Sequence, residues 1–337
     1  MIDKEAIQKR VLLLASQGGK GIAAVLSREL GISRQAAGTR LQRMVANGLL
    51  VPTGATRNKQ FALADLQSVE AAYQCAGLRE DIVWRELGAP LVAGFPENVR
   101  DIWRHSMTEM INNAIDHSGS PDVTVKMRRN ALHTTASVAD RGEGIFLKIQ
   151  KALNLYDPRE AILELAKGKF TTDPDNHSGE GIFFSSKMFD LFDIRSGALH
   201  FMHHAGLSDT LIESPRNGTG TLVTMRLDND SQHTTKEIFD QFAAPEEYSF
   251  AKTIVPVKLA QHEGEKLVSR SQARRLTMRF ERFQTVILDF DSVAEIGQAF
   301  ADEVFRVFQN AHPQTRLIPS NMTLAVENMV KRANTKT

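Results

Sequence analysis

The sequence predicts an α+β protein made of several domains. The chain has 337 residues, and at about 100–200 residues per domain this suggests two or three of them. Apolar residues at helical spacing alternate with short β-like runs along most of the chain, which favours a mixed architecture. Charge is unevenly divided, because residues 1–62 hold ten Lys or Arg against three acidic residues. That segment therefore carries +7 and the rest of the chain −6, which indicates a basic domain joined to an acidic body.

The composition is typical of a cytoplasmic globular protein. Hydrophobic residues make up 42% of the chain and charged residues 24%. The single cysteine, Cys75, excludes an intramolecular disulfide and a cysteine-based zinc site. The first apolar run is too short for a signal peptide, and no segment approaches the roughly 18 apolar residues of a membrane span. We therefore expect a cytoplasmic location and no membrane partner.

Residues 1–64 predict three short helices followed by a two-stranded wing. The helices are expected over residues 4–16, 20–30 and 34–47. Gly31 marks the end of the second helix, and Ser33 is suited to cap the third. Ala37, Leu41 and Met44 should face inward from that third helix. The remaining run contains a glycine turn between two β-like segments, as a hairpin requires.

This pattern, carried by LSRELGISRQAAGTRLQRMVANGLLV at residues 26–51, resembles the winged helix-turn-helix domain of bacterial regulators. Arg and Gln side chains can contact both base edges and phosphates. The resemblance implies DNA contacts from the third helix and the wing, made by Arg34, Gln35, Thr39, Arg40, Gln42, Arg43, Arg57 and Lys59. The local +7 charge favours DNA as the partner, and protein binding by the same domain is the alternative.

Residues 65–97 are predicted to form a helical connector. The apolar residues with helical spacing in its first half are Leu66, Val69, Ala72 and Tyr73. A second amphipathic stretch, REDIVWREL, follows at residues 79–87.

Residues 98–230 predict alternating helices and strands. Helices are expected over residues 98–117, 146–153, 158–167 and 182–189, and strands over 122–130, 131–140, 190–206 and 209–228. On the first helix Glu109 and Asn113 are four residues apart, so both project from one face. A carboxylate can orient or deprotonate a water, and an amide oxygen is a hard ligand suited to Mg²⁺. A solvated helix edge is the alternative interpretation of these polar residues.

Two glycine motifs follow that helix. In SVADRGEGI, Asp140 ends a predicted strand and can accept a hydrogen bond from an exocyclic amine. Gly142 and Gly144 then allow the backbone to approach a flat ring, although Asp-Gly turns are also common without any ligand. In HSGEGIFF, Gly179 and Gly181 precede a helix whose free N–H groups are suited to phosphate.

Ser178, which immediately precedes Gly179, can add a hydroxyl to this second glycine motif. A third motif, NGTGT, places Thr221 at the entry to a strand. Taken in order, the helix with its Glu and Asn and the glycine motifs resemble the Bergerat-fold ATPases, the superfamily of gyrase, histidine kinases and MutL (GHKL). The resemblance covers about residues 98–228 and implies a Bergerat α/β sandwich that binds ATP with Mg²⁺.

The resemblance also implies a role for each residue. Glu109 would polarise the attacking water, Asn113 would bind Mg²⁺, and Asp140 would accept the adenine amine. The other adenine contacts would be Gly142, Gly144 and Thr221. Residues 146–178 would form a mobile lid, with Lys167 and Lys169 as candidate phosphate contacts. The phosphate-binding hinge would comprise Ser178, Gly179 and Gly181.

Residues 245–337 predict a small α/β domain in which strands and helices alternate. Ser269 and Gln272 are spaced as a capping box for one of its helices. The stretch VILDFDSVAEIGQAFADEVFRVF, residues 286–308, resembles a STAS-like domain, the fold of anti-sigma antagonists. Gln298 and Ala299 stand where those antagonists carry their phosphorylated serine. A docking or homodimerisation surface is therefore the expected role of this domain, rather than a kinase substrate.

Together these resemblances imply a cytosolic, ATP-responsive transcriptional regulator that binds DNA through residues 1–64. ATP and Mg²⁺ binding would order the lid, and any hydrolysis would make the chain a weak ATPase. One alternative is an anti-sigma-type serine or histidine kinase acting in trans on a partner protein. Another is a defence or stress effector in which the winged helix senses nucleic acid.

Overall fold

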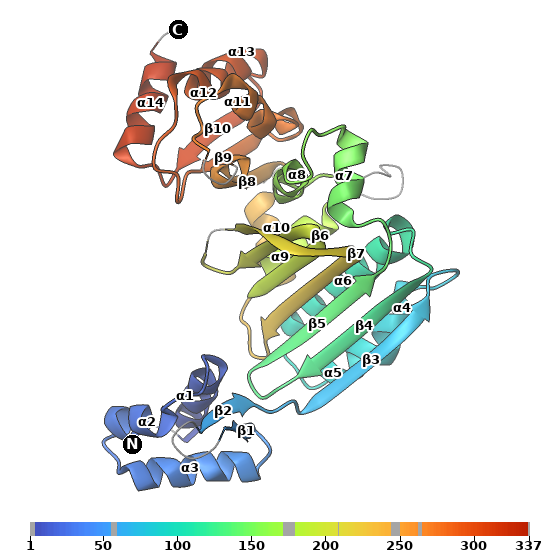
Figure 1. Cartoon of the computed structure of the whole chain (residues 1–337), viewed down its shortest axis with the longest axis vertical. Coiled ribbons are helices and arrows are strands. Elements are labelled where there is room, and N and C mark those ends of the chain that lie inside the picture. The colour runs from blue at the N-terminus through green and yellow to red at the C-terminus, as the bar shows by residue number, and fades with distance from the viewer. Residues whose placement is uncertain are drawn as a thin grey trace.

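The protein folds as three units of mixed α and β structure, as expected from the sequence. The structure is a computed structural model that describes residues 4–54, 59–170, 179–207, 209–243, 250–261 and 265–335. Figure 1 shows an N-terminal unit in blue, a central unit built on a large sheet, and a C-terminal unit in orange and red. We use these names for residues 4–63, 67–243 and 250–335, respectively.

The N-terminal unit has three helices and a two-stranded antiparallel hairpin. Its elements are α1 (Lys4–Ser16), α2 (Ile22–Leu30), α3 (Arg34–Ala46), β1 (Leu50–Thr53) and β2 (Gln60–Leu63). Gly31 ends α2 in the left-handed conformation with φ 63°, and the Ser33 hydroxyl accepts the Ala36 N–H at 3.1 Å to cap α3. Both signals had been predicted. The unit has its own apolar core, which Leu132 from the central unit completes.

The central unit is built on a five-stranded antiparallel sheet with the order β3-β4-β5-β7-β6. Its strands are β3 (Gln67–Gln74), β4 (Asp122–Arg129), β5 (His133–Asp140), β6 (Leu191–His204) and β7 (Thr210–Asp228). Side chains of β4 and β5 alternate between buried and less buried positions, so one face of the sheet forms the core. Figure 1 shows the strands crossing in front of helix α6 (Glu97–Asn112), which covers that face.

The predicted helical connector is wrong in its first half, because residues 67–74 form strand β3 at the edge of the sheet. Every residue of β3 has a partner on β4, from Gln67 opposite Arg129 to Gln74 opposite Asp122. Only Ala71 and Tyr73 of β3 pack against the core, which is the two-residue period of a strand. The second half is helical, in α4 (Glu80–Val83), η2 (Trp84–Gly88) and α5 (Ala89–Val92).

Four more helices follow α6 along the chain of the central unit. They are η3 (Asn113–His117), α7 (Ile145–Leu153), α8 (Glu160–Lys167) and α9 (Gly181–Met188). η3 is a π-helical turn that continues α6, and such turns inside helices often occur at functional sites. A further helix that the sequence analysis did not foresee, α10 (Thr235–Phe242), begins with a capping box between Thr234 and Glu237.

The C-terminal unit has a three-stranded parallel sheet with the order β10-β9-β8. Its strands are β8 (Lys252–Pro256), β9 (Thr285–Asp289) and β10 (Arg316–Ser320). Its helices are η4 (Val257–Ala260), α11 (Arg270–Thr277), η5 (Phe280–Arg282), α12 (Gln298–Asp302), η6 (Glu303–Phe308), α13 (Gln309–Ala311) and α14 (Leu324–Asn334). The predicted capping box at Ser269 and Gln272 is confirmed. The apolar core of this unit is continuous with that of the central unit.

The hairpin that joins β4 to β5 connects the central unit to the N-terminal core. It contains His133, which should make the stability of the folded protein depend on pH. Burial and the nearby guanidinium groups of Arg226 and Arg128 lower the pKa of His133 to about 4, whereas its ordinary value is 6.5. Between these two values the unfolded chain binds a proton that the folded chain does not, so stability should fall as the pH falls. After discounting for the partial exposure of His133, the loss should be on the order of 1 kcal/mol.

Urea unfolding at pH 7, 5.5 and 4 measures this loss. The matched control is His133→Gln, which keeps a polar side chain beside Asn130 but cannot titrate. The variant should show a shallower decline between pH 6.5 and 4 than the wild type. Parallel declines in the two proteins would contradict the assignment of this pH dependence to His133.

Candidate functional site

A cavity of about 270 Å³ lies between α6, β5, α7, α9 and β7 in the central unit. Seven of the predicted site residues line it: Glu109, Asn113, Asp140, Gly144, Gly179, Gly181 and Thr221. Gly142 lies next to the cavity but does not line it. Ser178 lies outside the described residues. Residues spread over about two thirds of the central unit in sequence thus line one cavity.

Asp140 lines the cavity at the point where strand β5 stops. Its Oδ1 atom accepts the N–H groups of Gly142 at 2.9 Å and Thr221 at 3.2 Å. Burial raises the pKa of the Asp140 carboxyl above its ordinary value, and the two N–H donors oppose this shift. The result is an oriented acceptor in a partly apolar cavity, which suits an exocyclic amine.

Gly142 and Gly144 are required by the packing of the turn that follows Asp140. A Cβ atom on Gly142 would lie 1.9 Å from the carbonyl oxygen of Ser118. Gly144 has φ +94°, and a Cβ atom there would lie 2.5 Å from the Ser196 hydroxyl. The sequence analysis attributed both glycines to approach by a ring, but the turn needs them for its own packing.

Thr221 fixes the start of α7 relative to the sheet. Its hydroxyl oxygen accepts the N–H of Ile145 at 3.0 Å, while its own N–H donates to Asp140. Thr221 therefore links β7, the end of β5 and the first turn of α7 within one set of hydrogen bonds.

Glu109 and Asn113 line the cavity from the end of α6 and the start of η3. The Nδ2 atom of Asn113 is buried and has no hydrogen-bond partner among the described residues. A buried amide without a partner is costly unless a ligand or water satisfies it, so this side chain indicates a binding site. A Cβ atom on Gly181 would lie 1.9 Å from Glu109 Oε2, which shows how closely the carboxylate meets the first residue of α9.

The cationic side chain that lines this cavity is Lys148 on α7, which the sequence analysis missed. Its Nζ atom donates to the carbonyl oxygen of His117 at 2.6 Å. Lys148 lies three residues after Ile145, so its position on the cavity face of α7 could have been inferred from helical spacing.

Lys167 and Lys169, the expected lid contacts, do not line the cavity. Lys167 Nζ donates to Glu164 at 2.5 Å and to the carbonyl oxygen of Met278 at 2.9 Å. Lys169 Nζ donates to the carbonyl oxygen of Arg282 at 3.0 Å. Both lysines are used in the contact with the C-terminal unit, against which α8 packs.

A second candidate surface follows the outer face of α3. Its exposed polar residues are Arg34, Gln35, Thr39, Gln42 and Arg43. Arg40 is half-buried, Lys59 is exposed next to β2, and Arg57 lies outside the described residues. The opposite face of α3 holds the residues predicted to be buried, Ala37, Leu41 and Met44. The helix thus presents a basic stripe on the side away from its core.

Two kinds of feature are absent from the described residues. No group of three or more His, Cys, Asp or Glu side chains in them could hold a metal ion. None of the helices in those segments is both long and apolar enough to cross a membrane.

Comparison with protein families gives a finding in the C-terminal unit. A family model described as a STAS-like domain of unknown function (DUF4325) matches residues 272–327. The chain therefore carries a STAS-like domain in its C-terminal unit, as the resemblance had implied. No curated protein matches the chain.

Gly142 offers a test of the turn that positions Asp140. Gly142→Ala should lower the free energy of unfolding by about 1–3 kcal/mol, because the added Cβ would collide with the Ser118 carbonyl and overpack the turn. Gly218→Ala is the control, since a Cβ there meets no atom within 4 Å. Thermal unfolding of the two variants measures the difference. Equal stability of the two would contradict the close approach at Gly142.

Proposed function

We propose that the chain is an ATP-responsive DNA-binding regulator whose central unit binds Mg²⁺-ATP as a GHKL domain. The observation that carries this proposal is the convergence of Glu109, Asn113, Asp140 and Thr221 on one cavity. These residues were selected by motif and come from four different elements. Their meeting in one hollow is what a nucleotide site of this type requires.

The lining of the cavity offers groups that suit both the base and the phosphates of ATP. Asp140 offers a carboxylate held by backbone N–H groups, which is an acceptor for the adenine amine. Helix α9 begins at Gly181, which also lines the cavity, and N–H groups at a helix start favour phosphate. Lys148 adds a positive charge to the same cavity.

Glu109 and Asn113 lie where the chemistry would occur. The unpartnered Nδ2 atom of Asn113 is a donor that suits a phosphate oxygen, and the oxygen of the same amide is of the type that binds Mg²⁺. Glu109 would orient a water towards the terminal phosphate from its position beside Gly181. The chain would then be a weak ATPase.

The N-terminal unit would deliver the response to DNA as a winged helix. The basic stripe on α3 has the residue types that contact base edges and phosphates. This unit touches the central unit through Leu132 and through an ion pair between Lys9 and Asp230 at 2.6 Å. ATP binding in the central unit could therefore alter the orientation of α3 by shifting the population of two arrangements.

The second candidate is a protein kinase acting in trans. The STAS-like match favours it, because the resemblance links such domains to anti-sigma antagonists. Transfer of labelled phosphate from ATP to a partner protein, without any change in DNA affinity, would favour this candidate.

The nucleotide assignment can be tested by calorimetry with Mg²⁺-ATP. Asp140→Asn should abolish measurable binding, because an amide group presents N–H where the adenine amine needs an acceptor. Glu109→Ala should keep binding and lose turnover, because the acid acts on water rather than on the nucleotide. Asp228→Asn is the control, since Asp228 is also partly buried at a strand end but does not line the cavity.

Loss of binding in the control would point to a general fold defect. Equal affinity for all three variants and the wild type would refute the site.

The DNA assignment can be tested by the salt dependence of binding. Arg34→Ala and Arg43→Ala should each weaken binding to a promoter fragment, and each lost phosphate contact should reduce the salt slope by about one. Arg104→Ala, an exposed arginine on α6, is the control. Fluorescence anisotropy at several salt concentrations, with and without ATP, measures both effects. An unchanged slope in both α3 variants would count against DNA binding by this face.

A further inference from the structure

We propose that Arg279 of the STAS-like domain is a positioning residue for the nucleotide cavity, and that this domain thereby sets nucleotide affinity. This inference rests on the proposed function of the cavity. It concerns how residues 160–170 of the central unit are held, because two of them, Leu165 and Phe170, line the cavity.

The segment 160–170 is bound to the STAS-like domain through buried charges. Glu164 is 1% exposed, and its two oxygens accept Lys167 Nζ at 2.5 Å and the Arg279 guanidinium at 3.0 Å. Lys167 is 0% exposed and donates further to the carbonyl oxygens of Arg275 at 3.1 Å and Met278 at 2.9 Å. Each cation is thus shared between the two units.

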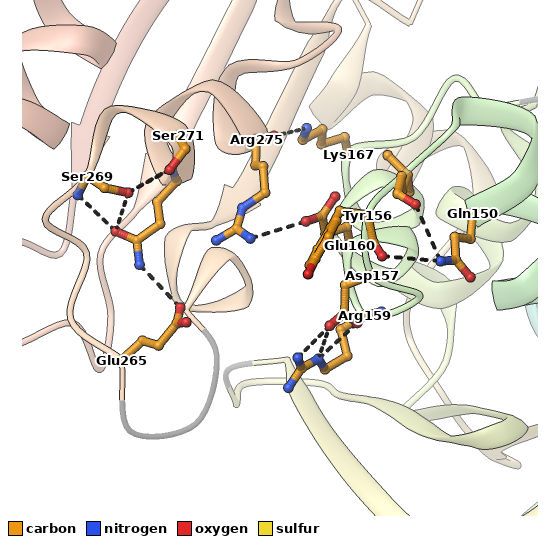
Figure 2. A network of polar contacts seen from close by, with 12 residues as sticks. Gln150, Tyr156, Asp157, Arg159, Glu160, Lys167, Glu265, Ser269, Ser271 and Arg275 are labelled. Carbon is orange, nitrogen blue, oxygen red and sulfur yellow. Dashed lines mark hydrogen bonds and ion pairs between the residues drawn. The ribbon is translucent and has the colours of Figure 1, made fainter.

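Additional contacts join the rim of the same junction. Figure 2 shows Arg275 of α11 reaching Glu160, the first residue of α8, and the two groups are 3.1 Å apart. It also shows Lys167 beside the backbone of Arg275. In the reverse direction, the Thr253 hydroxyl donates to the carbonyl oxygen of Lys167 at 2.8 Å.

The backbone is strained on both sides of the junction. Arg279 has φ 67° and Lys169 has φ 55°, although neither is a glycine. The Arg279 guanidinium donates to the carbonyl oxygen of Lys169, and Lys169 Nζ donates to that of Arg282. Strained backbone persists only where its surroundings impose it, and here the imposing contacts cross between the units.

Arg279 reaches the cavity through one aromatic ring. Its guanidinium carbon lies 5.4 Å from the centre of the Phe170 ring, a cation–π distance, and Phe170 lines the cavity. Arg279 therefore acts on the site through Phe170 rather than by touching a nucleotide itself.

The polar character of this junction suits a regulated contact. Buried ion pairs contribute little net stability, because the cost of removing charges from water offsets their attraction. They are specific in geometry, however, so they select one arrangement of the units. A ligand that prefers this arrangement stabilises the junction, and by linkage the junction stabilises the ligand.

Calorimetry with Mg²⁺-ATP and hydrogen exchange on the full chain test the inference. Arg279→Met should weaken Mg²⁺-ATP binding at least tenfold and speed exchange in residues 160–170 of the nucleotide-free protein. Arg274→Met is the matched control, because Arg274 lies on the same domain but pairs with Glu303 within it. It should change neither quantity. In the wild type, ATP should slow exchange in α11 and η5.

Arg279→Lys separates positioning from charge, since it keeps the cation but lacks the planar fork that binds Glu164 and the carbonyl oxygens together. It should recover only part of the lost affinity. Should Arg279→Met fail to fold, Arg275→Met serves instead, with a loss of about threefold expected from the single contact to Glu160.

The outcomes separate the two proposals. If the wild type binds no nucleotide, the proposed function and the effect on affinity both fail, and exchange in the nucleotide-free variants alone decides whether Arg279 holds the segment. If the wild type binds and Arg279→Met binds equally well, the positioning role is overturned while the nucleotide site stands.

Discussion

The hydrogen bonds to Asp140 are the interaction on which the candidate site depends. One carboxylate oxygen receives two backbone N–H groups, one from the turn after β5 and one from β7. A partly buried carboxylate is costly without such donors, so the turn, the strand and the start of α7 must keep their relative positions. The same three elements form one wall of the cavity. The chemistry of this pocket and the local fold around it are therefore constrained by the same few bonds.

The three units are coupled to different degrees. The N-terminal unit has a separate core that Leu132 and Ala131 join from outside, whereas one apolar core runs through the central and C-terminal units. The latter junction combines aromatic contacts around Phe250 with the buried charges around Glu164. Apolar packing supplies affinity between units, and the ionic network selects their orientation. The STAS-like domain is thus better described as a structural part of the central unit than as an appended domain.

Local patterns in the sequence were sufficient to predict most helices, several capping residues and seven of the residues that line the cavity. The spacing within α6 and the position of Asp140 at a strand end could be predicted without any tertiary information. Strand β3 could not, because only Ala71 and Tyr73 pack against the core, and two positions are too few to distinguish a strand from a helix. The partners of Lys167 were equally hidden, since spacing along α8 does not specify which neighbour a side chain meets. Burial of a side chain against another unit depends on the tertiary structure and is not visible in the local sequence.

The strand that replaces the expected connector also shortens the path between units. Residues 64–66 alone separate β2 from β3, and the N–H groups of Ala64 and Leu66 are bonded to the carbonyl oxygens of Leu49 and Arg129. Three extended residues span only about 10 Å. The N-terminal unit, which includes α3, is consequently joined to the sheet by a linker that is too short to absorb a twist of the sheet. Any such twist would be transmitted to α3 as a rotation.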